Sequence, residues 1–395
     1  MLLQWLVLLL LAVVVAGCAT PPRSITQEQA KAATVPGFAA VRVPLDASPA
    51  EYQRVFRPSK IERKRRLTFL ALSGGGAGGA FGAGVLCGWT DRGDRPQFDI
   101  VSGVSTGALI APFAFLGSDY DPVIRKIYTR GFGKRLIDQI DFMGLFGDGL
   151  IPQDKMRQMV RPFVDEALLA RIAEEYRKGR RLVVLTTNLD SGRAIAWNMG
   201  AIAVTGGPRA VALFTAVLAA SASVPVAMAP AFIQTVADGI PIEEMHVDGS
   251  TTQPILTIPQ SLMVNDRGEW SGQTVDLYLV VNAKLEPPFK VVDGSVLDIA
   301  SQAVATLIRS AEQAQVFATY NFAREHRFGY HLAAIGPDVE DRDFVDEFQT
   351  AFMQRLFENG YRRARSGTAF RTRPLPDAPP SRQAESRQPR LVSAE

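Results

Sequence analysis

The chain has 395 residues, of which 47% are hydrophobic and 21% are charged, a balance typical of a globular protein with a sizeable core. Its two cysteines, Cys18 and Cys87, exclude a disulfide framework, and the three scattered histidines form no Cys/His cluster at metal-ligand spacing. The net charge is only +3, and the basic clusters at 57–66 and 362–395 lack interleaved aromatics, so we interpret them as solvated segments rather than nucleic-acid-binding surfaces.

The N-terminus has the features of an export signal. Residues 2–15 are almost entirely apolar, which is too short for a membrane span of about 20 residues but typical of a signal-peptide core. The segment ends in Val15-Ala16-Gly17-Cys18, which resembles the bacterial lipobox. The resemblance implies a lipoprotein signal peptide at 1–17 and a lipidated Cys18; because Ala19 follows, it implies an outer-membrane anchor facing the periplasm. The alternative is a plain signal peptide, or an uncleaved anchor, with a chance cysteine.

Residues 18–65 are predicted to be a tether and an N-terminal arm, because prolines and small residues are frequent there. The folded domain is predicted at 66–365, and a basic, proline-rich disordered tail at 366–395. Within the domain, apolar runs predict strands at 67–72, 98–101, 182–186, 194–197 and 277–281, and helices at 79–89, 106–116, 154–178, 209–220, 295–325 and 344–363. Strands that alternate with helices predict an α/β fold with a mostly parallel central sheet covered on both faces.

A glycine-rich loop follows the first strand: Ser73 is followed by Gly74, Gly75, Gly76 and Ala77, then by two more glycines. Glycines allow a tight turn in which successive backbone N–H groups point at one spot, and the helix behind adds positive partial charge. Either a dinucleotide pyrophosphate or the oxyanion of an acyl-transfer intermediate could bind there. The second strand ends without the acid that a dinucleotide site requires, so the oxyanion interpretation is favoured.

The second predicted strand ends in Gly103-Val104-Ser105-Thr106-Gly107, a G-x-S-x-G sequence at a strand-to-helix junction. This pattern is typical of a nucleophile elbow, in which Ser105 has a strained backbone and projects its hydroxyl. Gly103 and Gly107 would keep neighbouring side chains from clashing with the turn. The alternative is an ordinary loop serine with no catalytic role.

A serine needs a base to accept its proton, and Asp248 is the candidate. An apolar strand delivers this aspartate onto a turn that begins with Gly249. A partly buried carboxylate has a raised pKa and can deprotonate a serine directly. Asp238-Gly239 has a similar sequence, but it lies between the apolar runs 232–236 and 240–247, which predicts a hairpin turn.

The glycine loop, the elbow and the later Asp-Gly, in that order, resemble the patatin-like phospholipase family. The stretches 188–198 and 219–225 resemble the family as well, the second through its A-x-S-A-x-x-P pattern. The resemblance covers 67–254. It implies a three-layer α/β/α fold, no metal or cofactor, and hydrolysis of fatty-acyl esters of lipids or phospholipids. Carried over, Ser105 is the nucleophile and Asp248 is the base. The backbone amides of Gly74, Gly75, Gly76 and Ala77 are expected to form the oxyanion hole.

Three other possibilities remain open. The serine could belong to a Ser-His-Asp triad of the α/β-hydrolase kind, with His326 or His331 as the histidine. The protein could also be a non-catalytic envelope lipoprotein that binds lipid on a hydrolase scaffold. Finally, the apolar segment 132–151 could be a lid at the lipid entrance, although ordinary core packing explains its residues equally well.

Overall fold

The computed structural model describes residues 23–56, 66–138, 151–264, 272–287, 289, 291–292, 294–342 and 344–374. The predicted signal peptide, Cys18 and most of the predicted tail lie outside these residues. Residues 139–150, which make up most of the segment considered as a lid, also lie outside them. Within the described part of the chain, no helix has both the length and the hydrophobicity needed to cross a bilayer.

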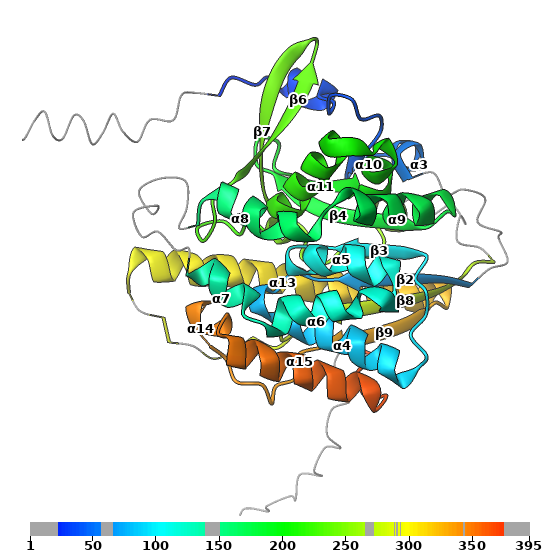
Figure 1. Cartoon of the computed structure of the whole chain (residues 1–395), viewed down its shortest axis with the longest axis vertical. Helices are drawn as coiled ribbons and strands as arrows, with labels where there is room; N and C mark the ends of the chain where they lie inside the picture. The colour runs from blue at the N-terminus through cyan, green and yellow to red at the C-terminus, as the bar shows by residue number, and fades with distance from the viewer. Residues whose placement is uncertain are drawn as a thin grey trace, which may run out of the picture.

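One sheet of nine strands forms the centre of the protein (Figure 1). The strands are β1 (Arg42–Pro44), β2 (Arg66–Leu72), β3 (Ile100–Gly103), β4 (Arg181–Asn188), β5 (Arg193–Asn198), β6 (Ala231–Ala237), β7 (Ile240–Asp248), β8 (Thr274–Val281) and β9 (Gly329–Ala334). The main path runs β1-β5-β4-β3-β2-β8-β9, and the β6–β7 hairpin joins at β4. The strands from β4 to β9 in this path are parallel, whereas β1, β5, β6 and β7 pair antiparallel. The predicted α/β fold with a mostly parallel central sheet is confirmed, with antiparallel additions at one side.

Helices cover both faces of the sheet and make three layers. The helices are α2 (Gln27–Ala32), α3 (Pro49–Phe56), α4 (Gly79–Arg92), α5 (Thr106–Leu116), α6 (Asp121–Thr129), α7 (Phe132–Ile137), α8 (Gln153–Val160), α9 (Glu166–Arg177), α10 (Met199–Thr205), α11 (Gly207–Ser221), α12 (Gln260–Val264), α13 (Val296–His326), α14 (Phe344–Glu347) and α15 (Thr350–Arg365). The larger core joins one face of the sheet to α4, α5, α6, α11 and α15. On the opposite face, α13 and α3 cover two smaller cores.

Successive side chains of β2 point to opposite faces of the sheet, and both faces are buried, which explains why its sequence is continuously apolar. Leu70 and Leu72 point into the larger core, whereas Leu67, Phe69 and Ala71 point into the core under α13. A strand that is buried on both faces has no solvent side and therefore no polar alternation.

The predicted helix at 154–178 is two helices. Pro162 lies in a short 3-10 turn after α8, where its ring prevents the helix from continuing. Asp165 then caps α9, because its carboxylate accepts the backbone N–H of Leu168 at 2.7 Å. The predicted helix at 344–363 is likewise divided into α14 and α15.

The predicted hairpin turn is confirmed. Asp238 and Gly239 form a two-residue loop between β6 and β7, with φ values of 51° and 78°. Positive φ at both positions is the geometry of a type I′ turn, which matches the twist of the two strands. Asp238 is therefore a turn residue rather than a base.

The predicted N-terminal arm contributes a strand that the sequence did not reveal. Within residues 23–56, β1 pairs with β5, and Arg42 on β1 forms an ion pair with Glu244 on β7. Burial alone would raise the pKa of Glu244, but hydrogen bonds and charge from Arg42 and His246 lower it to about 2. The arm is therefore fastened to the sheet by a buried ion pair as well as by backbone pairing.

At the other end, the predicted tail begins at residue 366, and the described chain continues to residue 374. The backbone of Arg371 forms an antiparallel bridge with Leu332 of β9, with N–H to O distances of 2.8 and 2.9 Å. The chain at Arg371, which was predicted to lie in a disordered tail, therefore pairs with strand β9.

Candidate active site

The sheet topology brings the three predicted functional segments to one edge. The glycine loop follows β2 and the elbow follows β3, and these strands are parallel neighbours with Leu72 opposite Gly103. Asp248 ends β7, where it lies opposite Thr186 of β4, and β4 is the other neighbour of β3. The serine and the aspartate therefore follow two strands that pair with β4 one after the other, although 143 positions separate them in sequence.

Ser105 has the backbone conformation expected of an elbow. Its φ of 54° and ψ of −124° lie in a region that non-glycine residues rarely adopt, and such strain typically costs about 1–3 kcal/mol. The turn is closely packed, since a Cβ on Gly103 would lie 2.4 Å from the Gly107 carbonyl oxygen. A Cβ on Gly107 would lie 2.4 Å from the Leu72 carbonyl oxygen. Both elbow positions therefore require glycine.

Asp248 is a buried carboxylate with an unusually high pKa. Its Oδ1 accepts the backbone N–H of Ser250 at 2.7 Å. Burial raises the pKa of this carboxyl to about 6, while hydrogen bonding to Ser105 and Ser250 limits the rise. Oδ2 is buried and has no hydrogen-bond partner among the described residues, and the carboxyl interacts with the Ser105 hydroxyl without a full hydrogen bond. Catalytic hydrogen bonds are often loose before substrate binds.

The glycine loop lies close to the side chains of Ser105 and Ser250. A Cβ added to Gly74 would lie 2.3 Å from Ser250 Oγ and 3.4 Å from Ser105 Cβ. The N–H of Gly74 donates to the Pro254 carbonyl at 3.0 Å and is therefore already occupied. Of the four residues predicted for the oxyanion hole, three keep amides with no backbone acceptor in the described part of the chain: Gly75, Gly76 and Ala77.

The turn that ends α11 holds the nucleophile and the candidate base together, a role that the sequence did not reveal. The Ser221 hydroxyl accepts the backbone N–H of Ser105 at 3.0 Å. Two residues later, the Ser223 carbonyl accepts the backbone N–H of Asp248 at 2.8 Å. The A-x-S-A-x-x-P pattern at 219–225 was the available signal, but the pattern alone does not indicate which atoms these serines bind.

A second buried acid lies behind the glycine loop. Glu312 on α13 is 3% exposed, and burial raises its pKa to about 7, while a hydrogen bond with Ser73 limits the rise. Ser73 also receives the backbone N–H of Asn282 on its hydroxyl at 2.9 Å, and the Asn282 amide donates to the Ser73 carbonyl at 2.8 Å. These contacts fix the start of the loop from the side opposite Ser105.

The histidines have other partners. His246 is buried between Thr186 and Glu244, with its ring nitrogens 2.9 and 3.1 Å from their side-chain oxygens, and burial lowers its pKa. His331 stacks on Tyr278 at a centroid distance of 4.4 Å.

The two histidines considered for a triad lie far from the elbow along the sheet. His331 is on β9, three strands away from β3, a lateral separation of about 14 Å. His326 ends α13, and its Nδ1 lies 3.0 Å from the Phe322 carbonyl oxygen. His326 lies just before the amino end of β9, whereas Ser105 follows the carboxyl end of β3. Because these strands run parallel, the two residues lie at opposite edges of the sheet.

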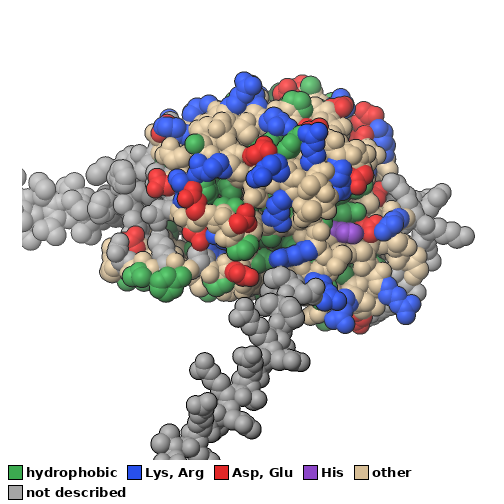
Figure 2. Space-filling model, turned by 90° about the horizontal axis from the view of Figure 1, so that it is seen from below, with side chains coloured by type: hydrophobic (Ala, Val, Ile, Leu, Met, Phe, Trp, Pro, Cys, Tyr) green, Lys and Arg blue, Asp and Glu red, His purple; other side chains and the backbone are tan. Residues whose placement is uncertain are grey.

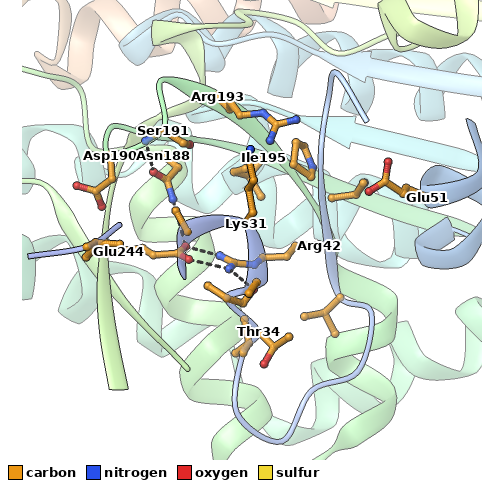
Figure 3. Close-up of a pocket in the computed structure, with 18 of the residues that line it drawn as sticks. Lys31, Thr34, Arg42, Glu51, Asn188, Asp190, Ser191, Arg193, Ile195 and Glu244 are labelled. Atoms are coloured by element: carbon orange, nitrogen blue, oxygen red, sulfur yellow. Dashed lines mark hydrogen bonds and ion pairs between the residues drawn. The ribbon is translucent and has the colours of Figure 1, made fainter. Parts of the chain in front are cut away.

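A hollow of about 1040 Å³ lies between the N-terminal arm and strands β4, β5 and β7 (Figure 3). In Figure 3, dashed lines join Arg42 directly to Glu244 in the lining of this hollow, and Asn188 donates to Glu244 at 3.2 Å. Neither Ser105 nor Asp248 lines this hollow. Arg42 and Glu244 neutralise each other as an ion pair, so neither charge is left to bind a substrate, and we do not assign the active site to this hollow. Among the described residues, no group of three or more His, Cys, Asp and Glu side chains is placed to hold a metal.

Comparison with known families decides the classification of this arrangement. Residues 70–257 match the family model described as patatin-like phospholipase, and this span contains the glycine loop, the elbow and Asp248. Residues 70–257 are therefore a patatin-like phospholipase domain. A domain of this family implies lipid acyl hydrolase activity.

Two solved structures of similar proteins complete the comparison. VipD from Legionella pneumophila is 13% identical, with a TM-score of 0.36, over 78% of this chain and 68% of that chain. The type III effector protein ExoU is 12% identical, with a TM-score of 0.19, over 76% of this chain and 53% of that chain. Both similarities are too low to add to the family match. No curated protein sequence matches this chain.

The raised pKa of Asp248 predicts the pH dependence of a patatin-like reaction at this site. A general base must be ionised, so kcat/KM for a soluble ester should fall about tenfold per pH unit below about pH 6. The measurement is a pH–rate profile from pH 4 to 9. Glu312→Gln should keep this acidic limb, and a limb near pH 6 that survives in Asp248→Asn would contradict the assignment.

The contact between Gly74 and Ser250 predicts a rescue experiment. Gly74→Ala should lower kcat at least roughly a hundredfold, because the new methyl group would overlap Ser250 Oγ and displace the loop. Ser250→Ala removes the overlapping oxygen, so the double variant should recover much of the loss. Ester hydrolysis by the four proteins is the measurement, and a double variant no better than Gly74→Ala alone would show that the predicted overlap is not the cause.

Proposed function

We propose that the protein is a serine acyl hydrolase that cleaves fatty-acyl esters of phospholipids through a dyad of Ser105 and Asp248. The observation that carries this proposal is the buried Asp248 carboxyl, which interacts with the Ser105 hydroxyl, while the amides of Gly75, Gly76 and Ala77 in the adjoining glycine loop have no backbone acceptor among the described residues. Burial keeps the base weakly hydrated and its pKa closer to neutrality than that of an exposed aspartate. The patatin-like domain supports a lipid ester as the substrate.

The reaction proceeds in two steps. In the first, Asp248 accepts the hydroxyl proton while Ser105 Oγ forms a bond to the ester carbonyl carbon. The carbonyl oxygen gains the negative charge, which the amides of Gly75, Gly76 and Ala77 would stabilise; losing one such donor typically costs about 2.7–4 kcal/mol. The tetrahedral intermediate then expels the alcohol, which takes the proton back from Asp248.

In the second step, water attacks the acyl-enzyme. Asp248 again accepts a proton, now from the water, and returns it to Ser105 as the fatty acid leaves. No histidine is needed, because one carboxylate serves as base and then as acid in both steps. The Ser221 hydroxyl and the Ser223 carbonyl hold the two groups in place throughout.

We also propose that the protein is a lipoprotein of the bacterial cell envelope. The support is the lipobox-like sequence that ends at Cys18, directly after an apolar segment. Several acyl chains, each contributing about 0.8 kcal/mol per buried methylene, would anchor the protein stably. Cys18→Ala should prevent incorporation of labelled palmitate, whereas Cys87→Ala should not; labelling of the Cys18 variant equal to wild type would contradict this proposal.

The catalytic proposal is tested by incubating the protein with phospholipid vesicles and identifying the released products by mass analysis. Wild type should release free fatty acid, whereas Ser105→Ala and Asp248→Asn should each reduce release by at least roughly a thousandfold. His326→Ala and His331→Ala should retain activity within a few-fold. An inactive histidine variant that folds normally would favour a Ser-His-Asp triad, and wild type without any hydrolysis would favour the non-catalytic lipid-binding alternative.

A further inference from the structure

The first half of α13 is apolar but has no covering partner in the described part of the chain. Between Val296 and Ala311 the charged residues are Asp298 and Arg309. Val296, Ile299 and Leu307 are 85%, 54% and 70% exposed. A soluble helix normally turns such side chains toward the core, so a face of this kind marks an interaction surface.

The exposed side chains form one continuous stripe. Positions 296, 299, 303 and 307 are spaced by three or four residues, which places them on one face of the helix. Ala303 is also exposed and fills the space between the larger side chains. We call the stripe formed by Val296, Ile299, Ala303 and Leu307 the α13 face.

The α13 face projects beyond the active-site edge of the sheet. Glu312, in the middle of the helix, contacts Ser73 at the start of the glycine loop. The 16 residues from Val296 to Ala311 therefore extend past the loop by about 24 Å. Figure 1 shows this half of α13 reaching out at the left, the side on which the parallel strands end. In Figure 2 hydrophobic side chains gather at the same end of the molecule.

We propose that the α13 face docks on the surface of a phospholipid bilayer and brings the mouth of the Ser105 site to its substrate. This inference rests on the proposed function. Insertion of an apolar helix face at the boundary between headgroups and acyl chains is how peripheral enzymes bind membranes. The stripe carries no Lys or Arg, so a neutral phospholipid surface should suffice.

The N-terminal end of the described chain agrees with this orientation. Arg23 pairs with Asp190, which follows the carboxyl end of β4. The predicted lipid anchor at Cys18 lies five residues earlier, a length of chain that spans at most about 18 Å. An anchor attached there would hold the same edge of the sheet near the membrane.

The test uses the full chain, with Leu307→Cys labelled by an environment-sensitive thiol fluorophore. Phosphatidylcholine vesicles with brominated acyl chains report contact through quenching. The matched control is Val204→Cys, since Val204 is 40% exposed on α10, and the unsubstituted chain gives the background from Cys18. Cys87 is buried and should not react. Both labelled proteins also carry Ser105→Ala, so that the vesicles remain intact.

The label at position 307 should be quenched, whereas the label at 204 should not. Equal quenching, or none at either position, would overturn the proposal. Shielding of position 307 that grows with protein concentration in the absence of vesicles would also overturn it, in favour of a second copy of the chain.

Activity provides the second readout. Ile299→Glu and Leu307→Glu should each lower hydrolysis of vesicle phospholipid roughly tenfold and leave hydrolysis of a soluble short-chain ester unchanged. Val204→Glu should change neither. Equal loss on both substrates would contradict docking. Quenching at position 307, together with a wild-type protein that hydrolyses neither ester, would refute the proposed function and leave the docking surface supported.

Discussion

The arrangement of the active site depends on the turn at the end of α11, which hydrogen-bonds to Ser105 after β3 and to Asp248 at the end of β7. β3 and β7 pair with β4 one after the other along the same edge, so Ser105 follows β3 close to the point where Asp248 ends β7. The turn that ends α11 joins the two, because the Ser221 hydroxyl accepts the amide of Ser105 and the Ser223 carbonyl accepts the amide of Asp248. Both serines are fully buried, so neither bond competes with water. The strained serine and the desolvated carboxylate are therefore held in place through their own backbone amides, one by the Ser221 hydroxyl and one by the Ser223 carbonyl.

The same edge is supported from the opposite face of the sheet. α13 packs its buried half against the sheet and reaches the glycine loop through Glu312 and Ser73. A carboxyl group with a raised pKa can stay protonated near neutrality, so it hydrogen-bonds the loop without placing negative charge behind the proposed oxyanion site. One helix thus supports the loop and, through its exposed half, offers the surface proposed to meet the membrane.

Much of this could be predicted from the sequence, because the informative segments are local. Glycines between an apolar strand and a helix specify a loop, and a glycine on each side of Ser105 specifies an elbow. Helix α5 was predicted with its observed ends, since the elbow fixes its start and Gly117 follows its end. The strand β1 was missed because its three residues are defined by pairing with β5, about 150 positions later. The engaged amide of Gly74 was missed for the same reason, since its partner is Pro254.

The most direct test of the account is to locate the reactive nucleophile and its base. The protein would be treated with a fluorophosphonate, digested, and the modified peptide identified by mass spectrometry. We expect an adduct on Ser105 that Asp248→Asn abolishes and that replacement of His326 or His331 leaves intact. An adduct on another residue, or labelling of Ser105 that persists without the Asp248 carboxylate but disappears with a histidine, would contradict it.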